Sequence, residues 1–287
     1  MKIQEPLVLV ARKQFHADLL STVISVKNGI PSIADNNNGA SIRISNFILQ
    51  QIGLLREVNK QAAQTAGDNF EKSCCTFLRN TFLNLKHLRP GQWDIHRIGR
   101  RADAGIASCD QYSHLKDLAT LCKSNPTLAA TLGMDYIISP DVVILRHPEP
   151  DNTINQNALL VDSQVSKLTP LRETNSSLSI LHASVSCKLT LRSDRAQNAR
   201  SEALNLIKNR KGQAPHIVVV TAEPLPSRLA SLAMGTGEID CVYHFALPEL
   251  QAAIDQESNE DSKESLRIMI EGKRLRDIAD LPLDLAT

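Results

Sequence analysis

The chain has 287 residues, of which 42% are hydrophobic and 22% charged, and its 32 Lys+Arg against 31 Asp+Glu give a formal net charge of +1. These proportions are ordinary for a globular protein and exclude a low-complexity chain or a polybasic coat protein. No apolar run approaches the roughly 20 residues that a membrane-spanning helix needs, so we expect no membrane segment.

The N-terminal half of the chain has mainly helical periodicity. Apolar residues recur at helical spacing in four segments: 41–60, 68–88, 111–122 and 127–132. Asp68 stands where it can cap the second of these helices, with Glu71 three residues later, as in a capping box. We therefore expect residues 1–132 to be a mainly helical part of one domain.

The C-terminal half alternates strands and helices. Strands are predicted in four segments: 136–145, 183–191, 216–221 and 240–245. Helical segments are predicted over 195–210, after Pro224 and from Pro248. This order predicts an α/β fold, with a mixed central sheet flanked by helices.

The strand predicted over 183–191 has strictly alternating apolar and polar residues, which is typical of a strand with one buried and one polar face. Residues 147–180 are polar and indicate a loop-like insertion between two core strands. We expect a single domain over residues 1–287, in which 133–250 form the catalytic sheet core and 251–287 a helical tail.

The six cysteines form no C-x-x-C motif, and none has a histidine at zinc-ligand spacing, so we expect no structural zinc site. Buried, reduced thiols are the simplest interpretation. Together with the lack of a signal-peptide pattern, they indicate a cytoplasmic protein.

Four side chains in the second half have the chemistry of a phosphodiesterase. Asp141 follows Pro140 in a predicted strand, Ser186 and Lys188 share the polar face of the alternating strand, and Glu202 lies in the helix that follows. Two carboxylates with backbone carbonyls suit a hard cation such as Mg²⁺. A lysine beside them can orient or deprotonate a water and offset charge on a phosphate.

Each of these residues also has a simple structural explanation, since a solvent-facing Lys188 or a solvated Glu202 would be unremarkable alone. The order of strand, strand and helix favours the functional interpretation, because it can bring the acid, the lysine and the second acid together. The conjunction therefore predicts a phosphodiester hydrolase that uses Mg²⁺.

The segment Arg192-Ser193-Asp194-Arg195 lies at the predicted corner between strand and helix. In one interpretation Asp194 caps the helix, with Gln197 completing a capping box. In the other the corner enters a DNA groove, where Arg matches guanine O6 and N7 and Asp accepts from cytosine N4. Residues 188–212 contain seven basic and two acidic residues, an excess of +5 that suits a phosphate-facing surface.

Residues 181–247 carry the most specific resemblance to a known family, through stretches such as His-Ala-Ser-Val-Ser-Cys-Lys, Arg-Ser-Asp-Arg-Ala-Gln-Asn-Ala-Arg-Ser-Glu and Gly-Thr-Gly-Glu-Ile-Asp-Cys-Val-Tyr-His-Phe. Here the chain resembles the type II restriction endonucleases of the PD-(D/E)xK superfamily, in the branch that cleaves sites with a CCGG core. The similarity extends over most of the chain from about residue 14.

The resemblance implies a restriction-endonuclease-like fold and assigns roles to particular residues. The implied catalytic side chains are Asp141, Lys188, Glu202, Ser186 and Glu71. The implied Mg²⁺ ligands are Asp141, Glu202 and the backbone carbonyl of Cys187. The implied readers of the CCGG core are Arg192, Asp194 and Arg195, and the implied contacts to the outer base pair are Asp35, Asn37, Gln64 and Arg228.

The chain departs from the family pattern at Asn37, where the resemblance would place a serine. An amide can still donate and accept hydrogen bonds, so GCCGGC is the expected recognition site. The resemblance further implies cleavage after the first G, four-base 5′ overhangs, and a homotetramer made of two dimers that each cut double-stranded DNA.

Two other functions compete with a sequence-specific endonuclease. One is a DNA-binding protein without cleavage activity on the same fold, although every catalytic position is filled. The other is a nuclease that reads DNA structure, which would not need the Arg-Ser-Asp-Arg corner. The near-neutral net charge does not oppose a DNA partner, because the excess of +5 over 188–212 is balanced by ten acidic against five basic residues over 249–287.

Overall fold

The computed structural model describes residues 5–53, 63–98, 105–132, 139–235, 237–257 and 259–287. Its centre is a six-stranded mixed sheet. The strands, in their order across the sheet, are β3 (Trp93–Arg97), β4 (Val142–Arg146), β5 (Ile180–Lys188), β6 (His216–Thr221), β7 (Cys241–His244) and β8 (Leu275–Asp277). Neighbours are antiparallel from β3 to β5 and parallel from β5 to β8.

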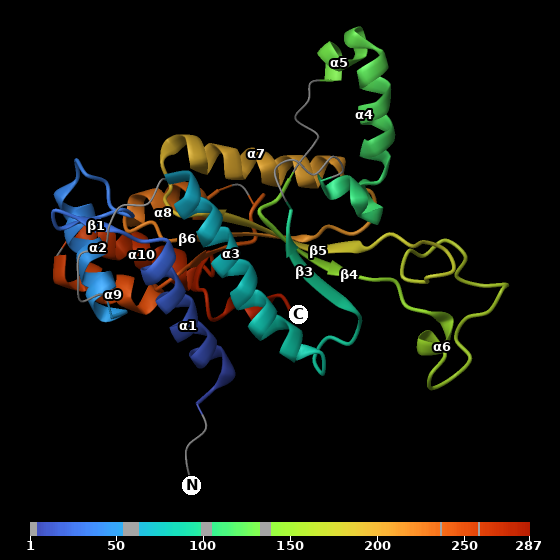
Figure 1. The fold of residues 1–287 in the computed structure, drawn as a ribbon, viewed down its shortest axis with the longest axis horizontal. Coiled ribbons are helices and arrows are strands. Elements are labelled where there is room, and N and C mark those ends of the chain that lie inside the picture. Colours follow the sequence, from blue (N-terminus) through green and yellow to red (C-terminus); the bar gives the residue numbers. More distant parts are fainter. Residues whose placement is uncertain (1–4, 54–62, 99–104, 133–138, 236, 258) are drawn as a thin grey trace.

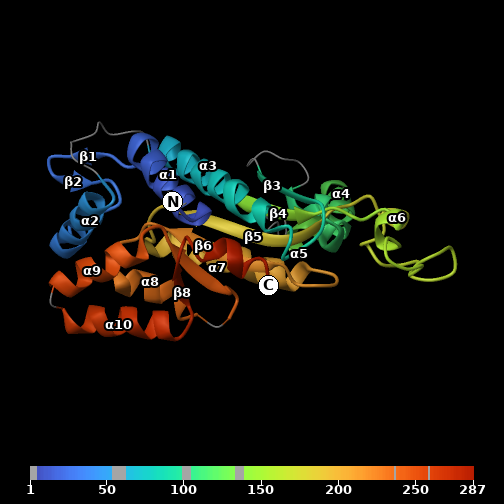
Figure 2. The ribbon, with the colours of Figure 1, turned by 90° about the horizontal axis from the view of Figure 1, so that it is seen from below.

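Helices cover both faces of this sheet (Figure 2). On one face lie α1 (Leu7–Thr22) and α3 (Ala63–Thr81), and on the other lie α7 (Ser193–Asn209), α8 (Pro226–Ala233), α9 (Leu247–Glu257) and α10 (Glu260–Glu271). The hairpin of β1 (Val26–Lys27) and β2 (Ile30–Pro31) lies beside α2 (Gly39–Gln51), which packs on α9. The predicted α/β fold with a mixed, helix-flanked sheet is therefore confirmed.

The remaining elements are short or peripheral. They are η1 (Phe82–Leu85), η2 (Gly105–Ser108), η3 (Asp110–Tyr112), α4 (His114–Ser124), α5 (Pro126–Leu132), α6 (Asp151–Ile154) and α11 (Leu281–Asp284). The predicted insertion between two core strands is present: the chain between β4 and β5 extends away from the sheet as a long loop that contains α6 (Figure 1).

The central strands are buried on both faces, which explains their composition. Five of the six residues of β6 are buried, and its run of Ile217 and three valines has no polar face. Burying one such side chain contributes roughly 1.5–3 kcal/mol, so this run favours a central position in the sheet. The predicted strand over 216–221 coincides with β6.

The expectation of a half-buried strand over 183–191 is wrong in two respects. The strand β5 runs from Ile180 to Lys188, and all of its residues between those two ends are buried. Its small polar residues Ser184 and Ser186 face a covering helix and not solvent, because α7 brings Glu202 within hydrogen-bond distance of Ser186. The alternation therefore marks two different buried faces.

Three further expectations need correction. Asp141 precedes β4 instead of lying within a strand. Asp68 does not cap a helix, since α3 already includes Ala63, and the Glu71 carboxylate binds Arg97 instead of completing a capping box. The tail over 251–287 is not purely helical, because β8 adds a strand to the sheet, and the N-terminal part contributes β3.

Other predicted boundaries fall close to the observed ones. The two short helices separated at Asn125 correspond to α4 and α5. The helix predicted over 41–60 begins at Gly39, with Asn38 as its N-cap, and its described part ends at Gln51. The last residues of that prediction, and the first three of the strand predicted over 136–145, lie outside the described residues.

Candidate active site

The antiparallel pairing of β4 with β5 places the predicted acid beside the predicted lysine. Val142 is the register partner of Val185, so the residue before β4 lies next to the last residues of β5. There, Asp141 Oδ2 accepts the backbone N–H of Cys187 at 2.7 Å and a hydrogen bond from Lys188 Nζ at 3.1 Å. Two residues 47 positions apart in the chain thus form a direct ion pair.

Helix α7 brings the second carboxylate to the same place. Glu202 Oε2 lies 3.7 Å from Lys188 Nζ and accepts a hydrogen bond from Ser186 Oγ at 3.2 Å. Asp141, Lys188, Glu202 and Ser186 are therefore contiguous, as the sequence predicts for one site. The Lys188 ammonium lies within ion-pair distance of both carboxylates.

Burial and charge act on the pKa values in this group. Burial raises the pKa of Glu202, and the charge of Asp141 raises it further, while Lys188 and Ser186 offset part of the effect. Burial alone would lower the pKa of Lys188, but Asp141 and Glu202 together hold it above its usual value. The ammonium form of Lys188 is stabilised by its two acidic neighbours.

Glu71 reaches the same cleft from α3. Its side chain is 9% exposed, and Oε2 accepts a hydrogen bond from Arg97 Nη2 at 2.7 Å. Arg97 in β3 also donates to Asp68 at 2.9 Å, so a cation from the edge strand holds this acid. Sequence reasoning missed Arg97, because β3 was not predicted.

Four of the five predicted catalytic residues line one cleft of about 740 Å³. It contains the predicted catalytic residues Glu71, Asp141, Lys188 and Glu202, and it is walled on another side by Lys27 and Asn28 of the β1–β2 hairpin. The sequence did not predict this hairpin either, because its strands have only two residues each. The Asn28-Gly29 pair at its turn is nevertheless a recognisable hairpin signal.

The Arg-Ser-Asp-Arg corner opens onto the cleft at the start of α7. Arg192 is the N-cap residue of this helix, so the alternative in which Asp194 is the cap is wrong, and Asp194 lies in the first turn with an exposed side chain. Arg195 Nη1 donates to Thr190 Oγ1 at 2.9 Å, and Arg192 and Arg195 both line the cleft. The corner therefore lies next to the candidate catalytic group.

A second hollow of about 640 Å³ collects the predicted contacts to the outer base pair. Asp35, Asn37, Arg192 and Arg228 line it together. Arg228 is bound to Asp35, whose pKa is lowered by the backbone N–H of Asn37 and then by the Arg228 hydrogen bond. Gln64 lies in the first turn of α3, and its side chain is outside the described residues.

The donor set of the cleft fits a hard divalent cation. Asp141 and Glu202 offer carboxylate oxygens that share a single lysine ammonium, and burial disfavours the charged form of Glu202, which a bound cation would reverse. The described residues contain no cluster of three or more His, Cys, Asp or Glu side chains placed to hold a metal. A cation here would therefore depend on backbone oxygen, water or DNA for its other ligands. The carbonyl of Cys187 stays a predicted ligand.

All six cysteines are free and buried. Cys187 lies at the cleft, and its thiol pKa is raised by Cys74 and by burial, so it is held in the neutral form. Among the described helices, none is long and apolar enough to cross a membrane.

Two acids and a lysine at the end of a mixed α/β sheet, next to an arginine-rich corner, are the arrangement expected of the class of restriction-endonuclease-like proteins. The chain belongs to the NgoMIV restriction enzyme family, whose model matches residues 15–287. It is 48% identical to the type II restriction enzyme NgoMIV of Neisseria gonorrhoeae over 283 residues, which cover 98% of this chain and 99% of the relative. A solved structure of the type IIF restriction endonuclease Bse634I with cognate DNA covers 95% of this chain and 92% of its own, at 14% identity and a TM-score of 0.32.

Family membership at this identity makes the chain a type II restriction endonuclease, which is a class of site-specific deoxyribonucleases. The predicted family is thereby confirmed. The roles of the individual site residues, the recognition sequence and the cofactor stay predictions.

Proposed function

We propose that this chain is a Mg²⁺-dependent endonuclease that recognises GCCGGC in double-stranded DNA and cuts after the first G, leaving four-base 5′ overhangs. The observation that carries the proposal is the contact of Asp141, Lys188 and Glu202 in a cleft beside the Arg-Ser-Asp-Arg corner. A DNA-binding protein without cleavage activity would not need a lysine held between two partly buried acids.

In this proposal Asp141 and Glu202 hold the cation through carboxylate oxygens, with Cys187 contributing its carbonyl. The bound cation supplies Lewis acidity at the phosphate and favours the nucleophilic form of water. Lys188 Nζ lies against both acids, where it can offset the charge that develops as a water oxygen adds to phosphorus and a backbone P–O bond breaks. Ser186 orients Glu202 through its hydroxyl, and Glu71 adds a further carboxylate to the lining of the cleft.

Base recognition is assigned to the Arg-Ser-Asp-Arg corner and to the residues in and near the second hollow. Arg192, Asp194 and Arg195 project from a helix start whose position is fixed by the same strand that carries Lys188. Arginine forks match guanine and the aspartate matches cytosine N4, which suits the CCGG core. Asp35, Asn37 and Arg228, with Gln64, are assigned to the outer G·C pair.

Incubating the protein with Mg²⁺ and two plasmids that differ only in a GCCGGC site tests this proposal. We expect cleavage of the site-containing plasmid alone, no cleavage with EDTA, and fragment ends whose sequence places the cut after the first G. Binding without cleavage would favour the non-cleaving alternative. Cleavage of both plasmids would favour a nuclease that reads DNA structure.

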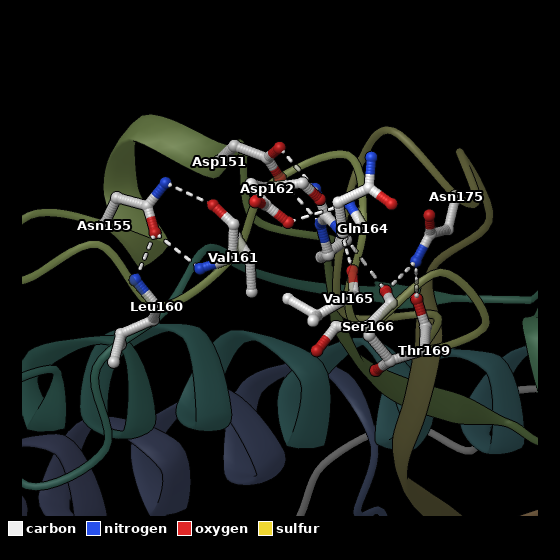
Figure 3. A network of polar contacts seen from close by, with 11 residues as sticks. Asp151, Asn155, Leu160, Val161, Asp162, Gln164, Val165, Ser166, Thr169 and Asn175 are labelled. Atoms are coloured by element: carbon white, nitrogen blue, oxygen red, sulfur yellow. Dashed lines mark hydrogen bonds and ion pairs between the residues drawn. The ribbon is translucent and has the colours of Figure 1, made fainter.

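We further propose that the enzyme is a homotetramer of two DNA-cutting dimers and acts in the cytoplasm. The insertion between β4 and β5 supports the tetramer. Arg172 orders this loop, because it donates to both carboxylate oxygens of Asp151 at 2.8 and 2.6 Å. It also donates to the backbone carbonyls of Val165 and Asp162 at 2.7 and 3.1 Å. Asn155 and Asn175 bind further backbone groups of the loop (Figure 3).

This ordered loop holds large apolar side chains in solvent. Leu168 is 94% exposed and Leu159 is 81% exposed, and Leu160 and Val165 add further apolar surface. Exposed apolar side chains on an ordered loop are typical of an interaction surface, and we take a second copy of this chain as the partner. We expect Leu159→Ser with Leu168→Ser to convert a tetramer into dimers in sedimentation velocity, while Leu88→Ser, also at an exposed leucine, leaves the tetramer intact. A wild-type protein that sediments as a dimer would contradict the tetramer.

A further inference from the structure

Glu223 is a fully buried carboxylate that lies outside the catalytic group. It follows β6 and precedes α8, and its side chain is 0% exposed. Burial raises the pKa of this acid, while the N–H of Leu191, the charge of Arg228 and the N–H of Leu225 offset part of that effect. Placing a carboxylate in the interior is costly, so the groups that it binds indicate why it is there.

The two carboxylate oxygens of Glu223 bind two different DNA-reading segments. Oε2 accepts the backbone N–H of Leu191 at 2.8 Å, and Leu191 directly precedes Arg192 at the corner. Oε1 accepts the backbone N–H of Leu225 at 3.2 Å and lies 3.7 Å from Arg228 Nη1. One side chain thus joins the corner before α7 to the start of α8.

Arg228 has a second acidic partner. Its Nη2 binds Asp35 while its Nη1 faces Glu223, so the guanidinium is held between two carboxylates from different parts of the chain. Because a planar fork held at both ends has a fixed orientation, Glu223 limits how Arg228 can be presented in the hollow that it shares with Arg192.

We propose that Glu223 is a positioning residue that sets the spacing between the segment reading the CCGG core and the segment reading the outer base pair. The inference rests on the proposed function. It leads to a distinctive consequence, because loss of Glu223 should weaken discrimination at inner and outer base pairs together. Loss of a direct contact such as Asp35 should weaken discrimination at the outer pair alone.

Glu223→Gln tests this, since glutamine keeps the shape and one acceptor oxygen but replaces the other oxygen with a donor that faces an N–H group. Binding would be measured without divalent metal on duplexes carrying GCCGGC, an outer-pair variant and an inner-pair variant. We expect the ratio of cognate to variant affinity to fall about tenfold at each of the two positions, the size of effect associated with one well-placed base contact.

Asp277→Asn is the matched control. Asp277 is also a buried carboxylate that accepts a backbone N–H, from Leu247 at 2.9 Å, and binds an arginine, Arg12, at 2.9 Å. The Asp277→Asn variant should lower thermal stability as Glu223→Gln does, without changing either ratio of cognate to variant affinity. If Glu223→Gln lowers stability and leaves both ratios unchanged, Glu223 is a structural residue and the proposal is overturned.

A second variant covers the case in which Glu223→Gln does not fold. Glu223→Asp keeps the charge but withdraws it by one methylene, and the same pair of ratios is expected to fall; unchanged ratios would overturn the proposal. Failure of the proposed function is a separate result, because a wild-type protein that does not prefer GCCGGC removes the recognition site itself, whatever Glu223 does.

Discussion

The two ends of the central strand β5 both carry polar groups that are buried or partly buried, but these groups bind different kinds of partner. At the start of the strand, His182 Nε2 donates to the backbone carbonyl of Leu285 at 2.8 Å, and the Gln111 amide bonds to both backbone groups of Leu181. At the other end, Lys188 binds the carboxylate of Asp141 and faces a cleft.

The pKa shifts at the two ends differ in sign. Burial lowers the pKa of His182 to about 4, and the charges of Arg89 and Arg146 act in the same direction, against the hydrogen bond to Leu285. Burial acts the same way on Lys188, yet two carboxylates hold its pKa above the usual value. At the start of β5, which we call the closed end, the His182 side chain is therefore neutral. At the other end, which we call the open end because it faces the cleft, the Lys188 side chain is a cation between two carboxylates. Polar residues that contact one another beside a cleft indicate function better than polar residues paired with backbone.

The largest effect is expected from Asp141→Asn at the open end. The amide oxygen can still accept the N–H of Cys187, but the negative charge beside Lys188 and toward the cation is lost. We expect the cleavage rate of GCCGGC DNA to fall by about 1000-fold, in line with the loss of a main electrostatic group in an active site. Single-turnover cleavage with Mg²⁺ measures this, and binding to GCCGGC without metal should be retained.

Asp240→Asn is the control for this variant. Asp240 Oδ2 likewise accepts a backbone N–H from a sheet strand, that of Ile217 at 2.8 Å, but at the opposite end of the parallel strands. The Asp240→Asn variant should cleave GCCGGC DNA at the wild-type rate. Cleavage by Asp141→Asn at a rate within a few fold of wild type would remove Asp141 from the catalytic group.

The sequence predicted the open end of the sheet more fully than the closed end. The run from β5 to α9 was predicted in the right order, because its strands are apolar runs separated by amphipathic helices, which are local signals. Asp141, Ser186, Lys188 and Glu202 meet as expected, since the order of their elements determines which strand ends are neighbours.

The features that sequence reasoning missed depend on contacts distant in the chain. Strand β3 has one buried residue, Ile95, among half-buried neighbours, so it has no clear alternation, and its pairing with β4 defines it. Strand β8 has three residues. The burial of both faces of β5 requires α3 and α7 to cover it, which periodicity within one strand cannot reveal. Glu223 has no motif of its own, and its partners at Leu191 and Arg228 are known only from the fold.

At the closed end, His182→Gln should reduce the sensitivity of stability to acid. The folded pKa of His182, about 4, lies below the usual 6.5, so its contribution is complete above pH 6.5 and is lost as the pH falls from 6.5 toward 4. For His182 alone, the contribution lost amounts to roughly 3 kcal/mol of unfolding free energy. Glutamine can still donate to Leu285 but does not titrate, so the variant should lose about 3 kcal/mol less than wild type between pH 7 and pH 4.

Urea unfolding at the two pH values measures this difference. His87→Gln, at an exposed histidine, should lose as much stability as the wild type on acidification. An equal loss in His182→Gln and wild type would mean that the closed end does not exclude the charged form of His182, and the contrast between the two ends of β5 would fail there.

The smallest effect is expected just beyond the open end, at Asp194. If Asp194 accepts from cytosine N4, Asp194→Ala should reduce the preference for GCCGGC over a site altered at the inner base pairs by about tenfold. The acid also lies in the first turn of α7, where its negative charge interacts favourably with the helix dipole and stabilises the helix by roughly 0.5 kcal/mol.

Asp261→Ala separates the two roles of Asp194, because it removes an exposed acid from the same position in the first turn of α10. Both variants should unfold at slightly lower urea concentrations than the wild type, but only Asp194→Ala should change the ratio of cleavage rates on the two sites. Equal ratios in the two variants would limit Asp194 to stabilising the start of the helix, and the CCGG core would then be read by Arg192 and Arg195 alone.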